Sequence, residues 1–225
     1  MNKSIFSIAI DGPCGAGKSS VAKRVAKELG VLYLDTGAMY RAVGLYMLRN
    51  EICLEAAAIS AHAAEPAITV KYEDGVQKTF LFDEDVSGEI RTPEVSNAAS
   101  QVATVDAVRW RMVDLQREIA GGISLVMDGR DIGTCVLPDA TLKVYLTASA
   151  EVRAMRRFLE NQKTGSGQTY QQVLDDVNAR DINDTTREHS PLMKAADAVV
   201  VDSSDMTEDE VVRRVIELLF ARIRG

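Results

Sequence analysis

The residues that decide the fold are Ile10-Asp11-Gly12-Pro13-Cys14-Gly15-Ala16-Gly17-Lys18-Ser19, near the start of the chain. The last eight match the pattern G-x-x-x-x-G-K-[ST] at every fixed position. An apolar run, Ile5–Ile10, precedes them, and a helical pattern begins at about Ser19. Glycines let several backbone N–H groups converge on phosphate oxygens, and a helix N-terminus adds a favourable dipole. The stretch therefore predicts a nucleoside-triphosphate site between a strand and a helix.

Two residues of this loop have a predicted chemical role. Lys18 is expected to reach the β- and γ-phosphates, and the Ser19 hydroxyl is expected to ligate Mg²⁺. The loop alone does not identify the reaction, because kinases, GTPase switches, ATPase motors and nucleotide-binding modules all use it. The residues expected to contact ATP are Gly12, Pro13, Cys14, Gly15, Ala16, Gly17, Lys18, Ser19 and Ser20.

Short apolar runs recur along the chain and alternate with helical patterns. Such runs are typical of strands buried on both faces of a parallel sheet. Helices are indicated by Val21, Val25 and Leu29 and by one long apolar face over 95–119. We therefore predict a doubly wound, three-layer α/β fold with a five-stranded parallel sheet. The expected strands are Ile5–Ile10, Val31–Leu34, Ile123–Met127, Leu142–Leu146 and Ala198–Val201.

Other local signals refine this prediction. Thr169-Tyr170-Gln171-Gln172 and Thr207-Glu208-Asp209-Glu210 are capping boxes that open two further helices. Ile68–Tyr72 and Lys78–Phe82, joined through Asp74-Gly75, predict a β-hairpin inside a small insertion over about 60–92. The Gly-, Ser- and Gln-rich stretch 161–168 predicts a mobile loop.

Composition excludes several classes of protein. The 225 residues are 46% hydrophobic and 26% charged, which excludes disordered and collagen-like chains. No apolar run reaches the ~18 residues of a membrane span, and Ile5–Ile10 is too short for a secretory signal. Three widely spaced cysteines indicate a reducing, cytoplasmic setting. A net charge of -7 argues against nucleic acid as a partner. We expect a monomer with neither membrane nor nucleic-acid partners.

A second polar cluster follows the apolar run that ends at Met127. Asp128 stands where open α/β sheets bind ligands, beyond the carboxyl end of a strand, and is predicted to act in the Mg²⁺ or phosphate network. The adjoining Arg130 has the fork that binds an oxyanion at two points. Asp131 has two possible roles, accepting from an amino group or orienting that arginine.

The segment Asp35-Thr36-Gly37-Ala38-Met39-Tyr40-Arg41 leaves two interpretations open. It forms either a second anion site or a tight turn with a solvated arginine. Two more clusters lie farther on: Arg153, Arg156 and Arg157 on a helix beginning near Ala150, and Arg180, Asp184 and Arg187 around a loop-like 183–186. Because they flank the predicted loop, they indicate a mobile flap whose arginines neutralise charge during phosphoryl transfer.

With these residues in view, the chain resembles the bacterial-type cytidylate kinases, which are nucleoside monophosphate kinases, over nearly its whole length. The resemblance rests on the phosphate loop and on six further stretches. These are Asp35–Arg41, Asp85-Val86-Ser87-Gly88-Glu89-Ile90-Arg91-Thr92, Ser100-Gln101-Val102-Ala103, Asp128-Gly129-Arg130-Asp131-Ile132-Gly133-Thr134, Arg153–Arg157 and Arg180–Leu192.

The resemblance implies a core at 1–59, 93–149 and 191–225, a monophosphate-binding insertion at about 60–92 and a lid at about 150–190. It implies γ-phosphoryl transfer from ATP, with Mg²⁺, to CMP or dCMP. It assigns catalysis to Lys18, Asp128, Arg130, Arg153 and Arg157, and Mg²⁺ binding to Ser19 and Asp128. The acceptor nucleotide would contact Thr36, Tyr40, Arg41, Ser100, Arg109, Arg130, Asp131, Arg180, Asp184 and Arg187.

Within that set, Tyr40, Arg41 and Arg130 would hold the acceptor phosphate, and Ser100, Arg109 and Asp131 would read the cytosine edge. Rival functions remain in different classes. One is a GTPase switch, but the chain lacks the N-K-x-D sequence that such proteins use for guanine, because Asn2-Lys3 is followed by Ser4-Ile5. A kinase for uridylate, adenylate or shikimate would also use a phosphate loop of this kind, and so would a nucleotide-binding module without turnover.

Overall fold

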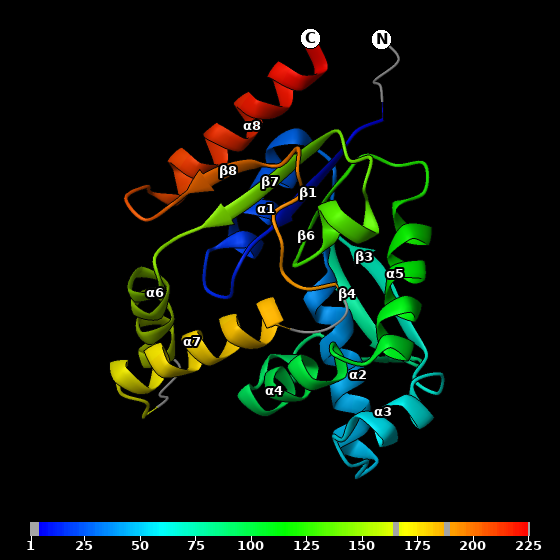
Figure 1. Ribbon diagram of the computed structural model, residues 1–225. Helices are drawn as coiled ribbons and strands as arrows, with labels where there is room; N and C mark the ends of the chain where they lie inside the picture. The colour runs from blue at the N-terminus through cyan, green and yellow to red at the C-terminus, as the bar shows by residue number, and fades with distance from the viewer. Residues whose placement is uncertain (1–4, 164–166, 187–189, 225) are drawn as a thin grey trace. The chain divides into compact units, whose positions relative to one another are not determined.

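A computed structural model describes residues 5–163, 167–186 and 190–224 (Figure 1). The chain forms two compact units, residues 1–31 with 123–225, and residues 32–122. The first unit contains β1 (Ser7–Asp11), α1 (Lys18–Leu29), β6 (Leu125–Gly129), the short π-helical turn η2 (Ile132–Val136), β7 (Leu142–Thr147), α6 (Ala150–Lys163), α7 (Tyr170–Thr186), β8 (Val199–Asp202) and α8 (Glu208–Arg224). The second contains β2 (Leu32–Asp35), α2 (Thr36–Arg49), α3 (Ala56–His62), β3 (Ile68–Glu73), β4 (Val76–Leu81), β5 (Glu84–Asp85), the 3-10 turn η1 (Glu89–Arg91), α4 (Pro93–Val102) and α5 (Asp106–Ala120).

The central sheet has five strands in the order β2-β6-β1-β7-β8. Strand β1 pairs in parallel with both β6 and β7, and β7 pairs in parallel with β8. The predicted α/β fold with a five-stranded parallel sheet is therefore confirmed, and so is each predicted strand. Every strand extends one or more residues past its apolar run, so that a residue such as Asp11, Asp35 or Asp128 lies inside the ladder at the carboxyl end.

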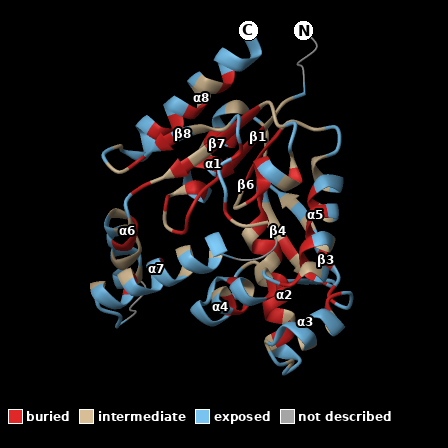
Figure 2. Cartoon of the chain, in the orientation of Figure 1, coloured by how far each residue is buried: buried red, intermediate tan, exposed pale blue. Residues whose placement is uncertain are grey.

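The inner strands carry the core of the first unit. Ile8, Ile10, Val126 and Met127 are fully buried, and Figure 2 shows the strands β1, β6 and β7 as largely buried chain. Helix α1 packs on β6, α8 packs on β7, and these two helices contact each other. Successive residues of these strands, such as Ile8, Ala9 and Ile10, are all buried, which is why the sequence of an inner strand does not alternate.

The predicted hairpin and both capping boxes are confirmed. Strands β3 and β4 are antiparallel, and Asp74 and Gly75 take φ values of 51° and 75°, as in a two-residue type I′ turn. A third strand, β5, joins β4. Thr169 and Thr207 exchange hydrogen bonds with Gln172 and Glu210 in the first turns of α7 and α8.

Two helical predictions need correction. The long apolar face over 95–119 belongs to two helices, because α4 ends at Val102 and Val105 is extended before α5 begins. Residues 183–186 are not a loop but the last turn of α7. There the hydroxyls of Thr185 and Thr186 donate to the carbonyls of Asp181 and Ile182, four residues earlier, which is compatible with a helix.

The predicted loop 161–168 lies partly in a helix. Residues 161–163 belong to α6, which is a correction, and 164–166 lie outside the described residues. Helices α6 and α7 pack on each other through a small apolar cluster of their own. Ala154, Val173 and Val177 are buried in it, with Ala150, Phe158, Tyr170 and Leu174 around them. Across the described part of the chain, no helix is both long and apolar enough to cross a membrane.

Candidate active site

The phosphate loop joins β1 to α1 in the conformation that its glycines permit. Gly12 has φ 149°, and a Cβ there would lie 1.9 Å from the carbonyl oxygen of Leu146 in β7. Gly17 caps α1 at φ 88° in the left-handed region. Neither position tolerates a side chain without strain. The loop therefore follows the close backbone path that the sequence pattern predicts.

Lys18 is the first residue of α1, and it is almost fully buried. Its Nζ donates to the carbonyl oxygen of Pro13 at 2.8 Å, across the loop. Burial, reinforced by the nearby charge of Arg130, lowers the pKa of Lys18 to about 8, although Asp128 opposes the shift. The ammonium group is thus protonated at neutral pH but held in a position that disfavours its charge. An anion at the loop would relieve that cost.

Ser19 and Asp128 lie together, as the sequence predicts. The Ser19 hydroxyl donates to Oδ2 of Asp128 at 2.8 Å, which joins the start of α1 to the end of β6. Asp128 is 5% exposed. A hydroxyl and a carboxylate are oxygen ligands of the kind that Mg²⁺ prefers, with waters and substrate phosphates completing its shell. The described residues contain no cluster of three or more His, Cys, Asp or Glu that could hold a metal ion by themselves.

Asp11, at the end of β1, is a site residue that the sequence patterns did not single out. Its carboxylate accepts from the backbone N–H groups of Ile132 and Gly133 at 2.8 and 2.7 Å. Burial raises its pKa to about 6 despite these bonds. Asp11 thereby fixes the turn that follows Arg130 and Asp131. The sequence signal that could have identified Asp11 was its position as a lone acidic residue at the end of an apolar strand.

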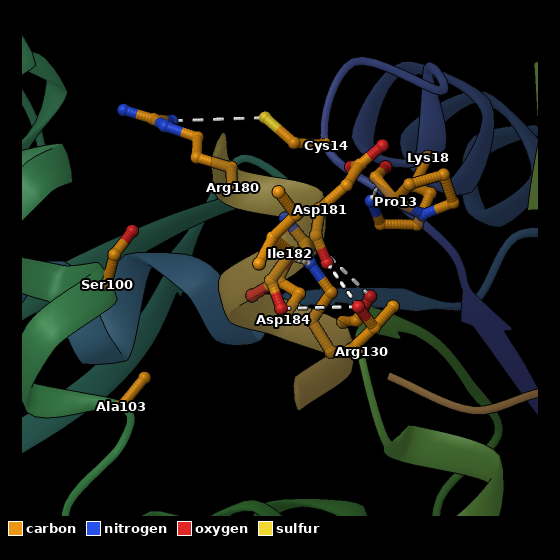
Figure 3. A network of polar contacts seen from close by, with 12 residues as sticks. Pro13, Cys14, Lys18, Ser100, Ala103, Arg130, Arg180, Asp181, Ile182 and Asp184 are labelled. Carbon is orange, nitrogen blue, oxygen red and sulfur yellow. Dashed lines mark hydrogen bonds and ion pairs between the residues drawn. The ribbon is translucent and has the colours of Figure 1, made fainter. Parts of the chain in front are cut away.

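Arg130 contacts α7 through an ion pair (Figure 3). Its Nε donates to Oδ2 of Asp184 at 2.6 Å, and Nη1 donates to the Gly129 carbonyl oxygen at 3.3 Å. Both Arg130 and Asp184 were expected at the acceptor nucleotide, and the structure brings them together. Asp131 is buried beside them, just before η2.

Arg153 is 4% exposed, and its guanidinium is surrounded by acceptors. It donates to the carbonyl oxygens of Ala148 and Cys14, both at 2.9 Å. It also forms a two-point pair with Asp181 of α7 at 3.0 and 2.6 Å. Arg153 therefore joins α6, α7 and the phosphate loop.

Two further arginines face the thiol of Cys14. Nη1 of Arg157 lies 3.2 Å from Sγ. Nη1 of Arg180 lies 3.9 Å from it (Figure 3). Burial alone would raise the pKa of the Cys14 thiol, but the charges of Arg157, Arg130, Arg180 and Lys18 outweigh it and lower that pKa. Cationic side chains therefore gather around the thiol of Cys14, although the net charge of the chain is -7.

The second unit carries its own cationic cluster, centred on Asp35. Oδ1 of Asp35 caps α2 by accepting from the Ala38 N–H at 2.9 Å. Oδ2 accepts from Nη2 of Arg41 at 2.9 Å and from Nη2 of Arg91 at 3.0 Å. The interpretation of this segment as a tight turn with a solvated arginine is wrong, because a regular helix starts at Thr36 and Arg41 is paired.

Arg91 was not identified as a site residue from the sequence. It appeared only inside a stretch that carried the family resemblance, and nothing in its spacing pointed to Asp35, 56 residues earlier. Thr36 and Tyr40 lie four residues apart on α2, next to Arg41, with Thr36 buried and Tyr40 half-buried. These residues form the second group of predicted contacts.

Ser100 and Arg109 lie on α4 and α5. The Ser100 hydroxyl donates to the Ser96 carbonyl oxygen at 3.2 Å, and Ser100 itself is exposed. Arg109 is buried, and its Nη1 donates to the carbonyl oxygen of Ala103 at 3.1 Å, in the break between the two helices. Arg187, the remaining predicted contact, lies outside the described residues.

The site residues thus fall into two groups, one in each unit. The first unit holds Gly12–Ser20, Asp128, Arg130, Asp131, Arg153, Arg157, Arg180 and Asp184. The second holds Thr36, Tyr40, Arg41, Ser100 and Arg109. A lysine, a hydroxyl–carboxylate pair and several arginines around a glycine-rich loop are the kinds of group that phosphoryl transfer uses.

The chain is similar to several known proteins. The sequence model of a family described as "Cytidylate kinase" matches residues 8–220. A protein named cytidylate kinase from Caldicellulosiruptor bescii is 49% identical over 221 residues, 98% of each chain. Another of that name from Mycolicibacterium paratuberculosis is 52% identical over 217 residues, 96% of this chain and 95% of that one. A gluconokinase structure from Sinorhizobium meliloti 1021 is similar in fold alone, with a TM-score of 0.52 and 18% identity over 97% of this chain and 93% of that chain.

Proposed function

Because the chain belongs to the cytidylate kinase family, we propose that it transfers the γ-phosphoryl group of ATP to CMP and dCMP, giving ADP with CDP or dCDP. The observation that carries this function is the pair formed by Ser19 and Asp128 beside the buried Lys18. The pair would hold Mg²⁺, which would supply positive charge to offset that of the ATP phosphates. A GTPase switch and a binding module without turnover do not fit a kinase family.

The acceptor needs no strong general base. A phosphate monoester with a second pKa near 6 is largely dianionic at neutral pH, so its oxygen is already a nucleophile. The chain must instead position the two phosphates in line and neutralise the charge between them. On the donor side, the loop N–H groups of Gly12–Ser20 and the ammonium of Lys18 bind the β- and γ-phosphates.

On the acceptor side, Arg41 and Arg130 would hold the CMP phosphate together with Tyr40, and Thr36 would line the same pocket. Each guanidinium already has a carboxylate partner, Asp35 or Asp184, that fixes its direction. Preorganised donors of this kind lose little freedom when the phosphate arrives, so more of the binding energy reaches the transition state. Asp184 and Arg180 would meet the ribose, and Arg187 the same nucleotide.

The cytosine ring is read by Ser100, Arg109 and Asp131. Cytosine presents an amino donor beside two acceptors, so a carboxylate suits the amino group and a guanidinium or hydroxyl suits the acceptors. Uracil presents a carbonyl where cytosine has the amino group, which leaves a buried carboxylate facing an acceptor. A site that leaves a buried polar group unpaired discriminates by up to about 10⁴-fold or more.

The lid arginines complete the transfer. Arg157 would neutralise charge on the migrating phosphoryl group from its place beside the loop. Arg153 is predicted to act with it, and its donors already contact Cys14, Ala148 and Asp181. Its contribution would therefore include holding the loop and α7 in the geometry that Arg157 and Arg180 require.

A coupled assay of ADP release tests the proposal, with ATP and Mg²⁺ and a panel of CMP, dCMP, UMP, AMP, GMP and shikimate. We expect strong turnover on CMP or dCMP, weak turnover on UMP and none on AMP, GMP or shikimate. Preference for UMP or AMP would overturn the assignments at Asp131 and Arg109. Silence on every acceptor, with ATP still bound, would overturn the function itself.

We also propose that the chain works as a cytoplasmic monomer. None of Cys14, Cys53 and Cys135 takes part in a disulfide, which suits a reducing compartment. Sedimentation at assay concentrations should give the mass of one chain, 24.5 kDa. A stable dimer under those conditions would contradict the monomer.

A further inference from the structure

The β3–β4 hairpin makes an unusual connection to β2. Its side chains bond to the main chain of β2: the Tyr72 hydroxyl donates to the carbonyl oxygen of Tyr33 at 3.0 Å. Gln77 makes two such bonds to Asp35, accepting from its N–H at 2.7 Å and donating to its carbonyl oxygen at 3.2 Å. Strand β2 is at one end of the five-stranded sheet. Side chains thus satisfy edge groups that a further strand would otherwise pair.

The side-chain amide of Gln77 suits hydrogen bonding to the main chain of an edge strand. It offers an acceptor and a donor side by side, which is the pattern of a peptide group on a neighbouring strand. Nε2 also lies 3.4 Å from Oγ1 of the buried Thr79, which limits how far the amide can rotate. The main chain of Asp35 is therefore fixed from outside the strand that contains it.

The side chain of Asp35 lies at the centre of the cationic cluster of the second unit, so fixing its main chain also positions that cluster. Its carboxylate caps α2 and accepts from both Arg41 and Arg91. Two guanidinium groups on one carboxylate leave a surplus positive charge, which favours an anion. The Nε of Arg41 is buried and has no hydrogen-bond partner among the described residues. Any tilt of Asp35 would move both arginines at once.

We propose that Gln77 is a positioning residue for the acceptor phosphate, acting through Asp35 on Arg41 and Arg91. This inference rests on the proposed function, in which Arg41 binds the phosphate of CMP. The hairpin would then influence affinity for the acceptor without touching it. A purely structural role, in which Gln77 only seals the edge of β2, predicts a different set of changes.

The test compares Gln77→Leu and Gln77→Glu with the intact chain. Leucine removes both bonds to Asp35, whereas glutamate keeps the acceptor for its N–H but places an oxygen against its carbonyl. We expect KM for CMP, and Kd for CMP by calorimetry, to rise about tenfold in either variant, as for the loss of two hydrogen bonds. KM for ATP should stay unchanged. Weak inhibition by cytidine, which lacks a phosphate, should also stay unchanged.

A matched control is Thr69→Leu, an exposed position of the same hairpin, which should leave KM for CMP unchanged. A double-mutant cycle gives the sharpest discrimination: in a background that carries both Arg41→Ala and Arg91→Ala, Gln77→Leu should add little to the loss of CMP affinity. Full additivity, or parallel losses for ATP and cytidine, would overturn the positioning role. If the unmodified chain fails to phosphorylate CMP, the proposed function fails before any variant is compared.

Discussion

Arg153 and Asp181 form a two-point ion pair between α6 and α7, with nitrogen–oxygen distances of 3.0 and 2.6 Å, and the same guanidinium donates to the main chain of the phosphate loop. The pair joins two helices of the predicted lid to the predicted ATP site. Its geometry makes Asp181 the residue that determines where Arg153 points.

Asp181→Asn should weaken both the fold and the use of ATP. It leaves a buried guanidinium without its charged partner, and we expect about 1–3 kcal/mol less stability in urea unfolding. KM for ATP should rise while KM for CMP changes less, because Arg153 contacts the Cys14 carbonyl oxygen. Asp175→Asn, on the exposed face of the same helix, is the control. Equal behaviour of the two variants would show that the pair has no role in catalysis.

The lowered pKa of Lys18 predicts a pH dependence of ATP binding. The ammonium of the ligand-free enzyme loses its proton as pH rises through about 8, so the Kd for ATP should increase above that pH. The effect on stability has the opposite sign. Between about pH 8 and pH 10.5, Lys18 is protonated in the unfolded chain but largely neutral in the folded one, so the contribution of this group to the free energy of unfolding increases as pH rises. Calorimetric titration with ATP from about pH 6.5 to about 9.5 covers the pKa of this group and measures the effect, and Lys18→Gln should lack that phase.

Asp131 should determine the choice between cytosine and uracil. Asp131→Asn supplies an amide donor that suits the uracil carbonyl, so the ratio of kcat/KM for CMP to that for UMP should fall by about 10²-fold or more. The measurement is the ratio in one competition assay, which cancels any change in the amount of folded enzyme. A ratio that stays constant while both rates fall would remove Asp131 from base recognition.

Alkylation should inactivate the enzyme through Cys14. The arginines around the thiol lower its pKa, and the thiolate is the nucleophile. Iodoacetamide should abolish activity when ATP is absent, ATP with Mg²⁺ should protect, and Cys14→Ala should resist. Labelling of the exposed Cys53, followed by mass spectrometry, serves as an internal control. Full activity after proven labelling of Cys14 would contradict the prediction.

Local patterns in the sequence predicted most of the fold. Buried parallel strands are continuous apolar runs, and the capping boxes at Thr169 and Thr207 mark helix starts within a single turn. The pairing of Ser19 with Asp128 also followed from a rule, since β1 and β6 are parallel neighbours and their carboxyl ends share one edge of the sheet.

The contacts that orient the site were not predictable in this way. Gln77 with Asp35, Arg91 with Asp35 and Arg153 with Asp181 each join residues at least 28 positions apart through side chains. Such hydrogen bonds leave no periodicity in the sequence, because any exposed polar residue could serve equally well. The polar composition of 183–186 misled for a related reason: threonine hydroxyls can bond back into a helix as readily as into a turn.

The apolar cluster between α6 and α7 has one more consequence. Phe158 and Tyr170 meet edge to face at 6.1 Å beside Ala154, Val173 and Val177, so the two helices share a hydrophobic interior of their own. A helical pair held in this way tends to open and close as one cooperative unit, and its amides exchange with solvent together. If α6 and α7 form the predicted lid, its opening would carry Arg153, Arg157 and Arg180 toward or away from a nucleotide as a single event.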